Sequence, residues 1–392
     1  MEKVKLGDIA VLINGDRGKN YPSQADITEE GDVPFVNAGH LTGRTIDFGD
    51  MNYISKEKYE KLSSGKFEKG DILYCLRGSL GKKAIVNDDV AGAIASSLVI
   101  IRPDYEKIDG DYLMFSLDSP SIKEQLVKAN NGSSQPNLSA ASVREYQIEL
   151  PDISHQKEVV EKLTRVRNVI DERQKELNLL DELIKARFVE LFGSISNNKF
   201  GYEVMTLQDV CEPIKDGTHQ TPTYTEDTVN GYKFLSSKDV TSGKVDWNHL
   251  KYIPEELHKE LYKRISPRKG DILLAKNGTT GVAAIVDRDD VFDIYVSLAL
   301  LRPLGMVTSE YLCSAVNSIE TKHQFDSSLK GIGVPNLHLG EIKKTKIVVP
   351  PIEAQEQFAD FVKQVDKSKV AVQRSLEETQ KLFDSLMQEY FG

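Results

Sequence analysis

An internal repeat places the strongest constraint on how this 392-residue chain can fold. Residues 69–86 read KGDILYCLRGSLGKKAIV, and residues 269–286 read KGDILLAKNGTTGVAAIV. Ten of the eighteen aligned pairs are identical, and most of the differences fall in the middle, where CLRGSL becomes AKNGTT. The chain therefore builds one piece of structure twice and varies one short segment of it.

The repeat extends over nearly the whole chain. FVNAGHLTGRTID at 35–47 matches FLSSKDVTSGKVD at 234–246, an offset of 199 positions. Further matches pair 132–139 with 331–338, 149–158 with 349–357, and 191–193 with 390–392. Two copies are too few for a solenoid, in which many short repeats stack. We therefore expect a duplicated domain.

The first part of each copy is typical of an α+β fold. Short β-prone runs such as KAIV, SSLVII, YKFLS and KIVV are separated by Gly, Pro, Asn and Asp, which favour turns. Between them, residues 111–128 carry apolar side chains at helical spacing. We predict two α/β globules with curved sheets, at residues 1–150 and 194–349.

The second part of each copy is predicted to be a long helix, at residues 151–193 and 350–392. Apolar residues recur at heptad a and d positions over five heptads, which is typical of a coiled coil. The predicted helix-pairing residues are Leu163, Val166, Ile170, Leu177, Leu180, Ile184 and Leu191, and in the second copy Val362, Val365, Val372, Leu376, Phe383, Leu386 and Tyr390. Polar residues interrupt the stripe at Arg173, Arg187, Lys369 and Thr379, where they can fix the register.

The chain supplies its own second helix, so we expect an antiparallel intramolecular coiled coil with the two globules at opposite ends. Roughly 40 residues at about 1.5 Å each make a rod near 60 Å long. One solvent-lined helix in each copy and a homodimeric zipper remain alternatives.

Composition argues against a membrane protein and a secreted protein. The longest apolar run, residues 91–101, is interrupted by two serines and is far shorter than the roughly 20 residues of a membrane span. The start, MEKVKLGDIA, lacks the apolar run of a signal peptide. Cys75, Cys211 and Cys313 lie far apart without CxxC or a nearby histidine, so we expect neither a disulfide framework nor a zinc site. These features predict a cytoplasmic protein.

No catalytic motif is complete in the sequence. RGSLGKK at 77–83 resembles a phosphate-binding loop but has Leu76 and Lys83 at two required positions. KGIGVPN at 330–336 lacks the third glycine of a dinucleotide-binding fingerprint. HExxH, GxSxG and zinc-deaminase signatures are absent, and the seven histidines are scattered. A duplicated domain on a rigid spacer indicates a non-catalytic, bivalent reader.

These segments resemble the specificity (S) subunit of Type I restriction–modification systems. The resemblance rests on the two KGDIL…AIV segments and on GSSQPNLSAASVREYQIELPDISHQKEVVEKL and GIGVPNLHLGEIKKTKIVVPPIEAQEQFADFV, each leading directly into a long helix. It covers both copies from end to end. The first copy departs from the family's usual Glu-Gln after the Pro-rich turn, because His155-Gln156 stands there, whereas Glu356-Gln357 lies near the second turn.

The resemblance implies two target recognition domains, each reading one half of a split double-stranded DNA target. It also implies that the two helices form a spacer and dock two methyltransferase (modification) subunits, which restriction subunits can join. Those partners would carry S-adenosylmethionine and methylate adenines, while this chain would need no cofactor or metal and would not be an enzyme. A duplex repeats its face every ~34–36 Å, so a rod of this length can hold two globules on successive major grooves.

The net charge of −10 is unusual for a protein that binds DNA, because phosphate neutralisation supplies much of the affinity. A local exception is the acid-free stretch from Ile72 to Asn87, which contains Arg77, Lys82 and Lys83. We expect the chain alone to bind DNA weakly. Two alternatives remain, a duplicated protein-interaction adaptor or antagonist without specific DNA binding, and an independently acting DNA-cutting or DNA-modifying enzyme.

Direct reading of base edges uses Arg or Lys for guanine and Asn or Gln for adenine, from side chains on exposed turns. In the first copy the candidate DNA-binding residues are Arg17, Lys19, Asn20, Tyr21, His40, Arg44, Arg77, Ser79, Lys82, Ser133 and Gln135. In the second copy they are Lys215, His219, Gln220, Thr223, Lys238, Lys276, Asn277, Thr279 and Lys330. Asn137 and Asn336, which follow prolines, are interpreted as turn-forming residues.

Overall fold

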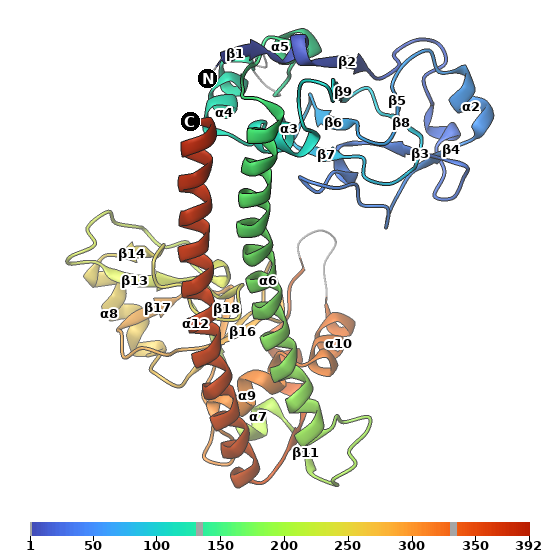
Figure 1. Cartoon of the computed structure of the whole chain (residues 1–392). Coiled ribbons are helices and arrows are strands. Elements are labelled where there is room, and N and C mark those ends of the chain that lie inside the picture. Colours follow the sequence, from blue (N-terminus) through green and yellow to red (C-terminus); the bar gives the residue numbers. More distant parts are fainter. Residues whose placement is uncertain (1, 131–135, 330–334) are drawn as a thin grey trace. The chain divides into compact units, whose positions relative to one another are not determined.

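The computed structural model of the protein describes residues 2–130, 136–329 and 335–392 (Figure 1). The chain forms two compact units. Unit 1 comprises Met1–Gln174 and Arg374–Gly392, and unit 2 comprises Lys175–Gln373. Each unit therefore contains one globular domain together with half of each long helix. Among the described residues, no helix combines the length and the apolar character that crossing a membrane requires.

The first copy of the repeat begins with β1 and ends with the long helix α6. Its strands are β1 (Glu2–Lys5), β2 (Ala10–Asn14), β3 (Val33–Val36), β4 (Tyr53–Ile54), β5 (Lys66–Phe67), β6 (Ile72–Cys75), β7 (Lys83–Ile85), β8 (Gly92–Ile94), β9 (Leu98–Pro103) and β10 (Gln147–Leu150). Its helices are α1 (Leu6–Ile9), α2 (Lys56–Lys61), α3 (Gly110–Ser116), α4 (Pro120–Ala129), α5 (Ala140–Arg144) and α6 (Ile153–Phe192), with the 3-10 turns η1 (Gln24–Asp26) and η2 (Ala38–His40).

The second copy repeats this order, except that its described residues form no counterpart of β5 or η1. Its strands are β11 (Glu203–Thr206), β12 (Lys215–Asp216), β13 (Tyr232–Leu235), β14 (Lys251–Ile253), β15 (Ile272–Ala275), β16 (Ala283–Ile285), β17 (Phe292–Ile294), β18 (Leu298–Leu301) and β19 (Lys346–Val349). Its helices are α7 (Leu207–Val210), α8 (Glu255–Arg264), α9 (Ser309–Val316), α10 (Ile319–Ser328), α11 (Leu339–Lys344) and α12 (Ile352–Phe391), with the 3-10 turn η3 (Ser237–Val240).

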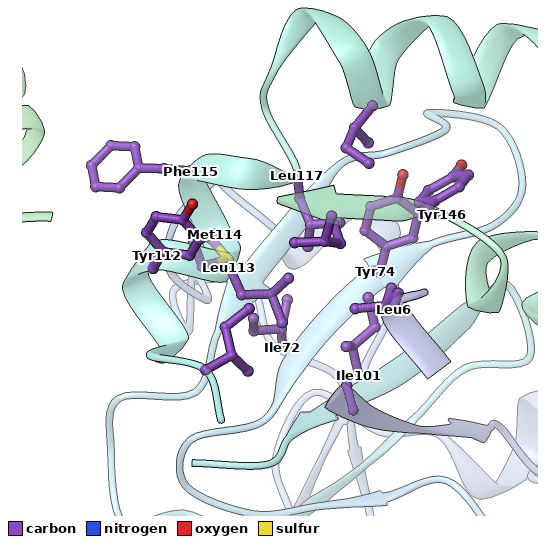
Figure 2. Close-up of a cluster of buried hydrophobic side chains, with 14 of the residues drawn as sticks. Leu6, Ile72, Tyr74, Ile101, Tyr112, Leu113, Met114, Phe115, Leu117 and Tyr146 are labelled. Carbon is purple, nitrogen blue, oxygen red and sulfur yellow. The ribbon is translucent and has the colours of Figure 1, made fainter. Parts of the chain in front are cut away.

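A four-stranded antiparallel sheet forms the centre of each domain. Its strand order is β2-β9-β6-β7 in the first domain and β12-β18-β15-β16 in the second. Alternate residues of β6 enter different hydrophobic clusters. Ile72 and Tyr74 belong to one cluster with residues of α3 (Figure 2) and of α6, and Leu73 and Cys75 pack on the opposite face. The corresponding residues of β15 divide in the same way. Because both faces are buried, the repeated KGDIL segment continues as an uninterrupted apolar run.

A smaller sheet covers the second face of each central sheet. Its order is β4-β3-β8-β5 in the first domain and β14-β13-β17 in the second. The pairs β3/β8 and β13/β17 are parallel, and β3/β4 and β13/β14 are antiparallel. The turn at residues 95–97 leads from β8 in the smaller sheet to β9 in the central sheet, and the turn at 295–297 leads from β17 to β18.

The long helices α6 and α12 pack antiparallel and lie side by side in Figure 1. In unit 1 the Lys162 Nζ lies 3.5 Å from the Tyr390 hydroxyl, so the start of α6 contacts the end of α12. In unit 2 the Arg187 guanidinium lies 5.8 Å from the ring centroid of Phe361, so the end of α6 contacts the start of α12. All of the predicted helix-pairing residues are buried or half-buried. The predicted α+β fold with an antiparallel intramolecular helix pair is confirmed, and the alternative of separate solvent-lined helices is wrong.

Large aromatic residues extend the helix pairing into the domains. In unit 2, Phe188 and Phe192 of α6 pack against Phe358 of α12 and Tyr311 of α9, with ring centroids 4.9 to 5.5 Å apart. In unit 1, Phe391 of α12 packs on α3. The heptad positions did not include Phe188, Phe192, Phe358 and Phe391, whose rings lie beside the a and d stripe and pack on residues of α3 or α9 or on one another.

A buried ion pair explains two of the repeated motifs, Gly-Asp and Arg-Pro. The Asp71 carboxylate accepts hydrogen bonds from Nε and Nη2 of Arg102, both at 2.7 Å, and Asp271 accepts the same pair from Arg302 at 2.7 Å. Both aspartates are only 1% exposed. The hydrogen bonds to the carboxylates raise the pKa of Arg102 and Arg302 above the usual value. These pairs fix β6 to β9 and β15 to β18.

A buried glutamine attaches each long helix to its domain. The Gln355 Oε1 accepts a hydrogen bond from the Thr308 N–H at 2.9 Å, and its Nε2 donates to the carbonyls of Met306 at 3.0 Å and Pro350 at 2.8 Å. Gln156 makes the same three bonds in unit 1. The counterpart of Gln156 is therefore Gln355 and not Gln357 of the Glu356-Gln357 pair.

Replacing Gln355 with alanine is expected to lower the free energy of unfolding of unit 2 by about 1–3 kcal/mol, because one N–H and two carbonyls lose their buried partner. Urea unfolding of the purified chain measures the loss. The matched control is Gln357→Ala, since Gln357 is exposed and its replacement should change stability by less than about 0.5 kcal/mol. Equal effects of the two substitutions would contradict the attachment role.

Candidate nucleic-acid interface

Three loops of the first domain converge on the turn between the smaller and the central sheet. The Ser96 N–H donates to the Tyr21 hydroxyl at 3.2 Å, and the Ser97 carbonyl accepts from the Leu76 N–H at 2.8 Å. The turn η2 also lies beside these loops, because the Lys82 Nζ donates a hydrogen bond to the carbonyl of Ala38, the first residue of η2, at 3.1 Å. Segments 17–21, 38–40 and 76–82, chosen from the sequence as separate candidates, therefore form one surface.

The second domain brings the equivalent three loops to the equivalent turn, although only the bond to the carbonyl of Ser97 or Ser297 is the same in both domains. The Ser297 carbonyl accepts from the Lys276 N–H at 2.9 Å, and its Oγ accepts from the Ser237 N–H at 3.0 Å. The Val296 N–H donates to the Thr218 carbonyl at 3.0 Å. Sequence reasoning did not single out Ser97 and Ser297, although the recurrence of Ser-Leu at 97–98 and 297–298 was available as a signal.

The loops β6–β7 and β15–β16 have the same backbone and different side chains. Gly78 and Gly278 at their tips have φ angles of 80° and 76°, a conformation that glycine adopts without steric cost. The glycines therefore recur while their neighbours change. Arg77 and Ser79 of the first domain become Asn277 and Thr279 in the second.

The Pro-Asn-Leu segments clamp these loop tips. Isolated β-bridges connect Arg77 with Asn137 and Asn277 with Asn336. Next to each bridge, a buried leucine donates its N–H to the loop backbone at 2.8 Å. The interpretation of Asn137 and Asn336 as turn-forming residues is wrong, because both lie in extended bridges.

The predicted DNA-binding residues of the first domain fall into two groups. Arg17, Lys19, Arg77 and Ser79 are exposed, whereas Asn20, Tyr21, Arg44 and Lys82 are half-buried and His40 is buried. The His40 Nδ1 accepts from the Asn37 N–H at 3.1 Å, and burial lowers the pKa of this imidazole. Tyr21 packs edge-on against Phe35, with centroids 5.9 Å apart. The second group therefore holds the loops in place.

The predicted residues of the second domain are mostly exposed. Lys215, His219, Gln220, Thr223, Lys238 and Thr279 are exposed, Asn277 is half-buried and Lys276 is buried. Three predicted residues, Ser133, Gln135 and Lys330, lie outside the described residues.

A buried carboxylate organises the cations of the second domain. Asp216 lies 3.2 Å from Lys276 Nζ, 3.2 Å from Arg264 Nη2 and 3.3 Å from His219 Nε2. Arg264, which sequence reasoning missed, and His219 keep exposed side chains, whereas Lys276 is enclosed. In the first domain the strand register places Asn14 at the position of Asp216, so this buried carboxylate has no counterpart there.

The predicted basic stretch of the first domain is smaller than its sequence indicates. Lys83 is buried and forms an ion pair with Asp118, and burial lowers the pKa of its ammonium group. Lys82 is half-buried against η2, so Arg77 is the exposed cation of this stretch.

Neither metal chemistry nor thiol chemistry is supported by the described side chains. Within residues 2–130, 136–329 and 335–392, no group of three or more His, Cys, Asp and Glu residues is arranged to hold a metal ion. Cys75, Cys211 and Cys313 are buried as free thiols, and burial raises the pKa of Cys211 and Cys313 to about 12. These thiols are protonated at neutral pH.

Comparison with known proteins identifies the family to which both copies of the repeat belong. The model of the Type I restriction modification DNA specificity domain matches residues 1–182 and again residues 200–380. The chain belongs to this family. It is a Type I specificity subunit that recognises DNA targets with two target recognition domains, and it has neither a catalytic role nor a cofactor of its own.

Relatives of this specificity subunit cover most of its length. The MjaVIII specificity subunit of Methanocaldococcus jannaschii is 24% identical over 93% of this chain and 86% of its own. The EcoKI specificity subunit of Escherichia coli K12 is 19% identical over 89% of this chain and 79% of its own.

Solved structures show the same fold. The Type I S subunit from M. genitalium has a TM-score of 0.55 at 14% identity, and covers 100% of this chain and 96% of its own. A chain from a study of complex assembly and conformational transition in a Type I system has a TM-score of 0.59 at 19% identity, over 100% and 97%.

Proposed function

We propose that this specificity subunit reads a bipartite double-stranded DNA target, one half-site with each domain, as part of a cytoplasmic complex. The convergence of the same three loops on the same turn in both domains, with different exposed side chains, is the observation that carries the proposal. Two different half-sites require a common scaffold with different reading groups. Joining two readers in one chain raises the effective concentration for the second contact.

The exposed side chains suit direct reading of base edges. Arg77 in the first domain is suited to the two acceptors of guanine, and Gln220 in the second to adenine. Arg17, Lys19 and Arg264 supply positive charge for phosphates in a chain whose net charge is −10. The candidate residues that are buried, His40 and Lys276, act in this proposal by holding loops.

The paired helices are proposed to dock two methyltransferase subunits, which restriction subunits can join. Several apolar side chains of α6 and α12 are exposed although the seam between the helices is covered: Val169 and Leu382 in unit 1, and Leu179, Leu183, Val189 and Val370 in unit 2. Exposed apolar patches of this kind are typical of protein interaction sites. The docked subunits would bring S-adenosylmethionine and methylate adenine.

Sequencing of methylated DNA tests the proposal. The chain is expressed with its methyltransferase subunit in a host without other adenine methylation. Methylation at one split sequence supports the proposal. The second candidate, a protein-interaction adaptor or antagonist, is favoured by the acidic net charge, and it predicts a stable complex without sequence-dependent methylation.

Arg77→Ala is expected to relax recognition of one half-site by about 1–3 kcal/mol, the discrimination that one bidentate base contact supplies. Methylation profiling of a library randomised in both half-sites measures the change. The matched variant Asn277→Ala, at the same loop position of the second domain, should relax the other half-site only. Unchanged preferences in both variants would exclude these loop tips as base readers.

A further inference from the structure

Four side chains form a continuous stack where the first domain meets the helix pair. The Arg44 guanidinium lies 5.2 Å from the centroid of Phe115, whose ring points away from Tyr74 and Tyr146 in Figure 2. The Arg167 guanidinium lies 5.0 Å from the same ring and 4.8 Å from the ring of Phe383. The stack therefore joins the loop after η2, α3, α6 and α12, all within unit 1.

An ionic cluster accompanies this stack. Asp118 pairs with Lys83 of β7 and lies 3.9 Å from Arg167 Nη2. Arg44 Nη2 lies 3.1 Å from Asp111 of α3. Burial lowers the pKa of both Lys83 and Arg167, so their charges are held in poorly hydrated surroundings. Charged side chains are seldom placed there without partners.

Stability alone does not account for these charges. Apolar residues of similar volume often replace a buried ion pair without loss of stability. The second copy shows that the fold forms without them, because Ala283 stands at the position of Lys83 and Asn317 at that of Asp118. The Asn317 amide bonds to the backbone of Ala283 at 2.9 Å in both directions. The charged cluster instead restricts the orientation of the domain relative to the helices, because the planar guanidinium of Arg167 between two rings tolerates little rotation.

We propose that Arg167 fixes the angle at which the first target recognition domain leaves the helix pair, and thereby restricts the separation of half-sites that the subunit accepts. This inference rests on the proposed reading of a bipartite target. Arg167 is a positioning residue here and is not assigned a DNA contact. A rotation of the domain that accommodates one base pair more or less would separate Arg167 from Phe115.

The test measures discrimination between separations. Target DNAs carry the two half-sites found by methylation sequencing, with their separation shortened by one base pair, unchanged or lengthened by one. The complete complex with its methyltransferase subunit methylates each DNA. Arg167→Met keeps the length of the side chain and removes its charge and planarity, and it is expected to reduce the preference for the unchanged separation about tenfold, the factor that ~1.4 kcal/mol supplies.

Two further variants make the result specific. Lys61→Met removes an exposed ion pair with Glu57 within α2, 2.6 Å long, which does not join the domain to the helices, and should leave the preference unchanged. Arg167→Lys keeps a cation but not the planar group, and an intermediate preference is expected. If Arg167→Met does not fold, the test compares the preference for the unchanged separation between Arg167→Lys and the wild type.

The outcomes separate this inference from the proposed function. An unaltered preference in the Arg167 variants overturns the inference. Methylation reduced by the same factor at all three separations also overturns it, because a simple loss of folded protein acts on all separations equally. If the wild type methylates no split sequence, the proposed function itself fails.

Discussion

Replacing Arg302 with alanine is expected to lower the free energy of unfolding of unit 2 by about 3–5 kcal/mol, because the substitution leaves the Asp271 carboxylate buried without its cation. Arg302 donates two hydrogen bonds to Asp271 at 2.7 Å and one to the Ser266 carbonyl at 2.8 Å. The carboxylate joins the start of β15 to the end of β18, the two inner strands of the sheet. Amide hydrogen exchange in these two strands, together with urea unfolding, measures the loss.

Two controls separate the buried pair from ordinary surface charge. Lys269→Ala removes an exposed pair with Asp289, 3.7 Å long, and should cost less than about 1 kcal/mol. The double variant Asp271→Leu, Arg302→Met removes both charges and should be more stable than Arg302→Ala, since no charge remains buried alone. If Arg302→Ala and Lys269→Ala lowered the free energy of unfolding equally, the Asp271–Arg302 pair would not be what stabilises the sheet.

Phe358→Ala is expected to have a comparable effect, about 3–5 kcal/mol, because it opens a cavity where α6, α9 and α12 meet. Phe358 is fully buried, and its ring centroid lies 5.5 Å from those of both Phe188 and Phe192. Removing the ring takes contacts from both partners at once. Thermal unfolding and hydrogen exchange in α9 measure the loss.

The control for this variant is a phenylalanine of unit 2 outside the core. Phe200 is 46% exposed and stacks only on Tyr202 among its aromatic neighbours in the described residues. Phe200→Ala should therefore change stability by less than about 1 kcal/mol. Similar losses for Phe358→Ala and Phe200→Ala would show that the aromatic cluster does not attach the helices to the domain.

The architecture could be predicted because it depends on patterns that are local or repeated. The heptad patterns that include Leu163 and Val365 predict paired helices without knowledge of where the partner helix lies in the sequence. The recurring Gly78 and Gly278 predict a turn with the same backbone conformation in both copies. Duplication added a second, independent example of each pattern. The same logic would have identified Gln156 and Gln355 as a pair, had the alignment followed the offset of 199 through the proline-rich turn.

The candidate site could be predicted only in part, because burial of a polar loop residue depends on partners distant in sequence. Lys276 is enclosed because Asp216 lies beside it, and Lys83 because Asp118 reaches it from the end of α3. Neither aspartate is near its lysine in the sequence. Arg264 was missed for the converse reason, since it ends a surface helix and reaches the site only through the same Asp216.

Unit 1 draws its core from two distant stretches of chain, and this has a consequence for synthesis on the ribosome. Phe383, Met387 and Phe391 belong to the same hydrophobic cluster as Leu6 and Tyr112, whereas unit 2 is one continuous segment. At roughly 5–20 residues per second, translation takes about 10–40 s to pass from residue 174 to residue 374. During that interval the nascent N-terminal domain lacks the α12 residues of this cluster, and exposed apolar surface of this kind is what chaperones bind. The part of the polypeptide that is made first is therefore the part that matures last.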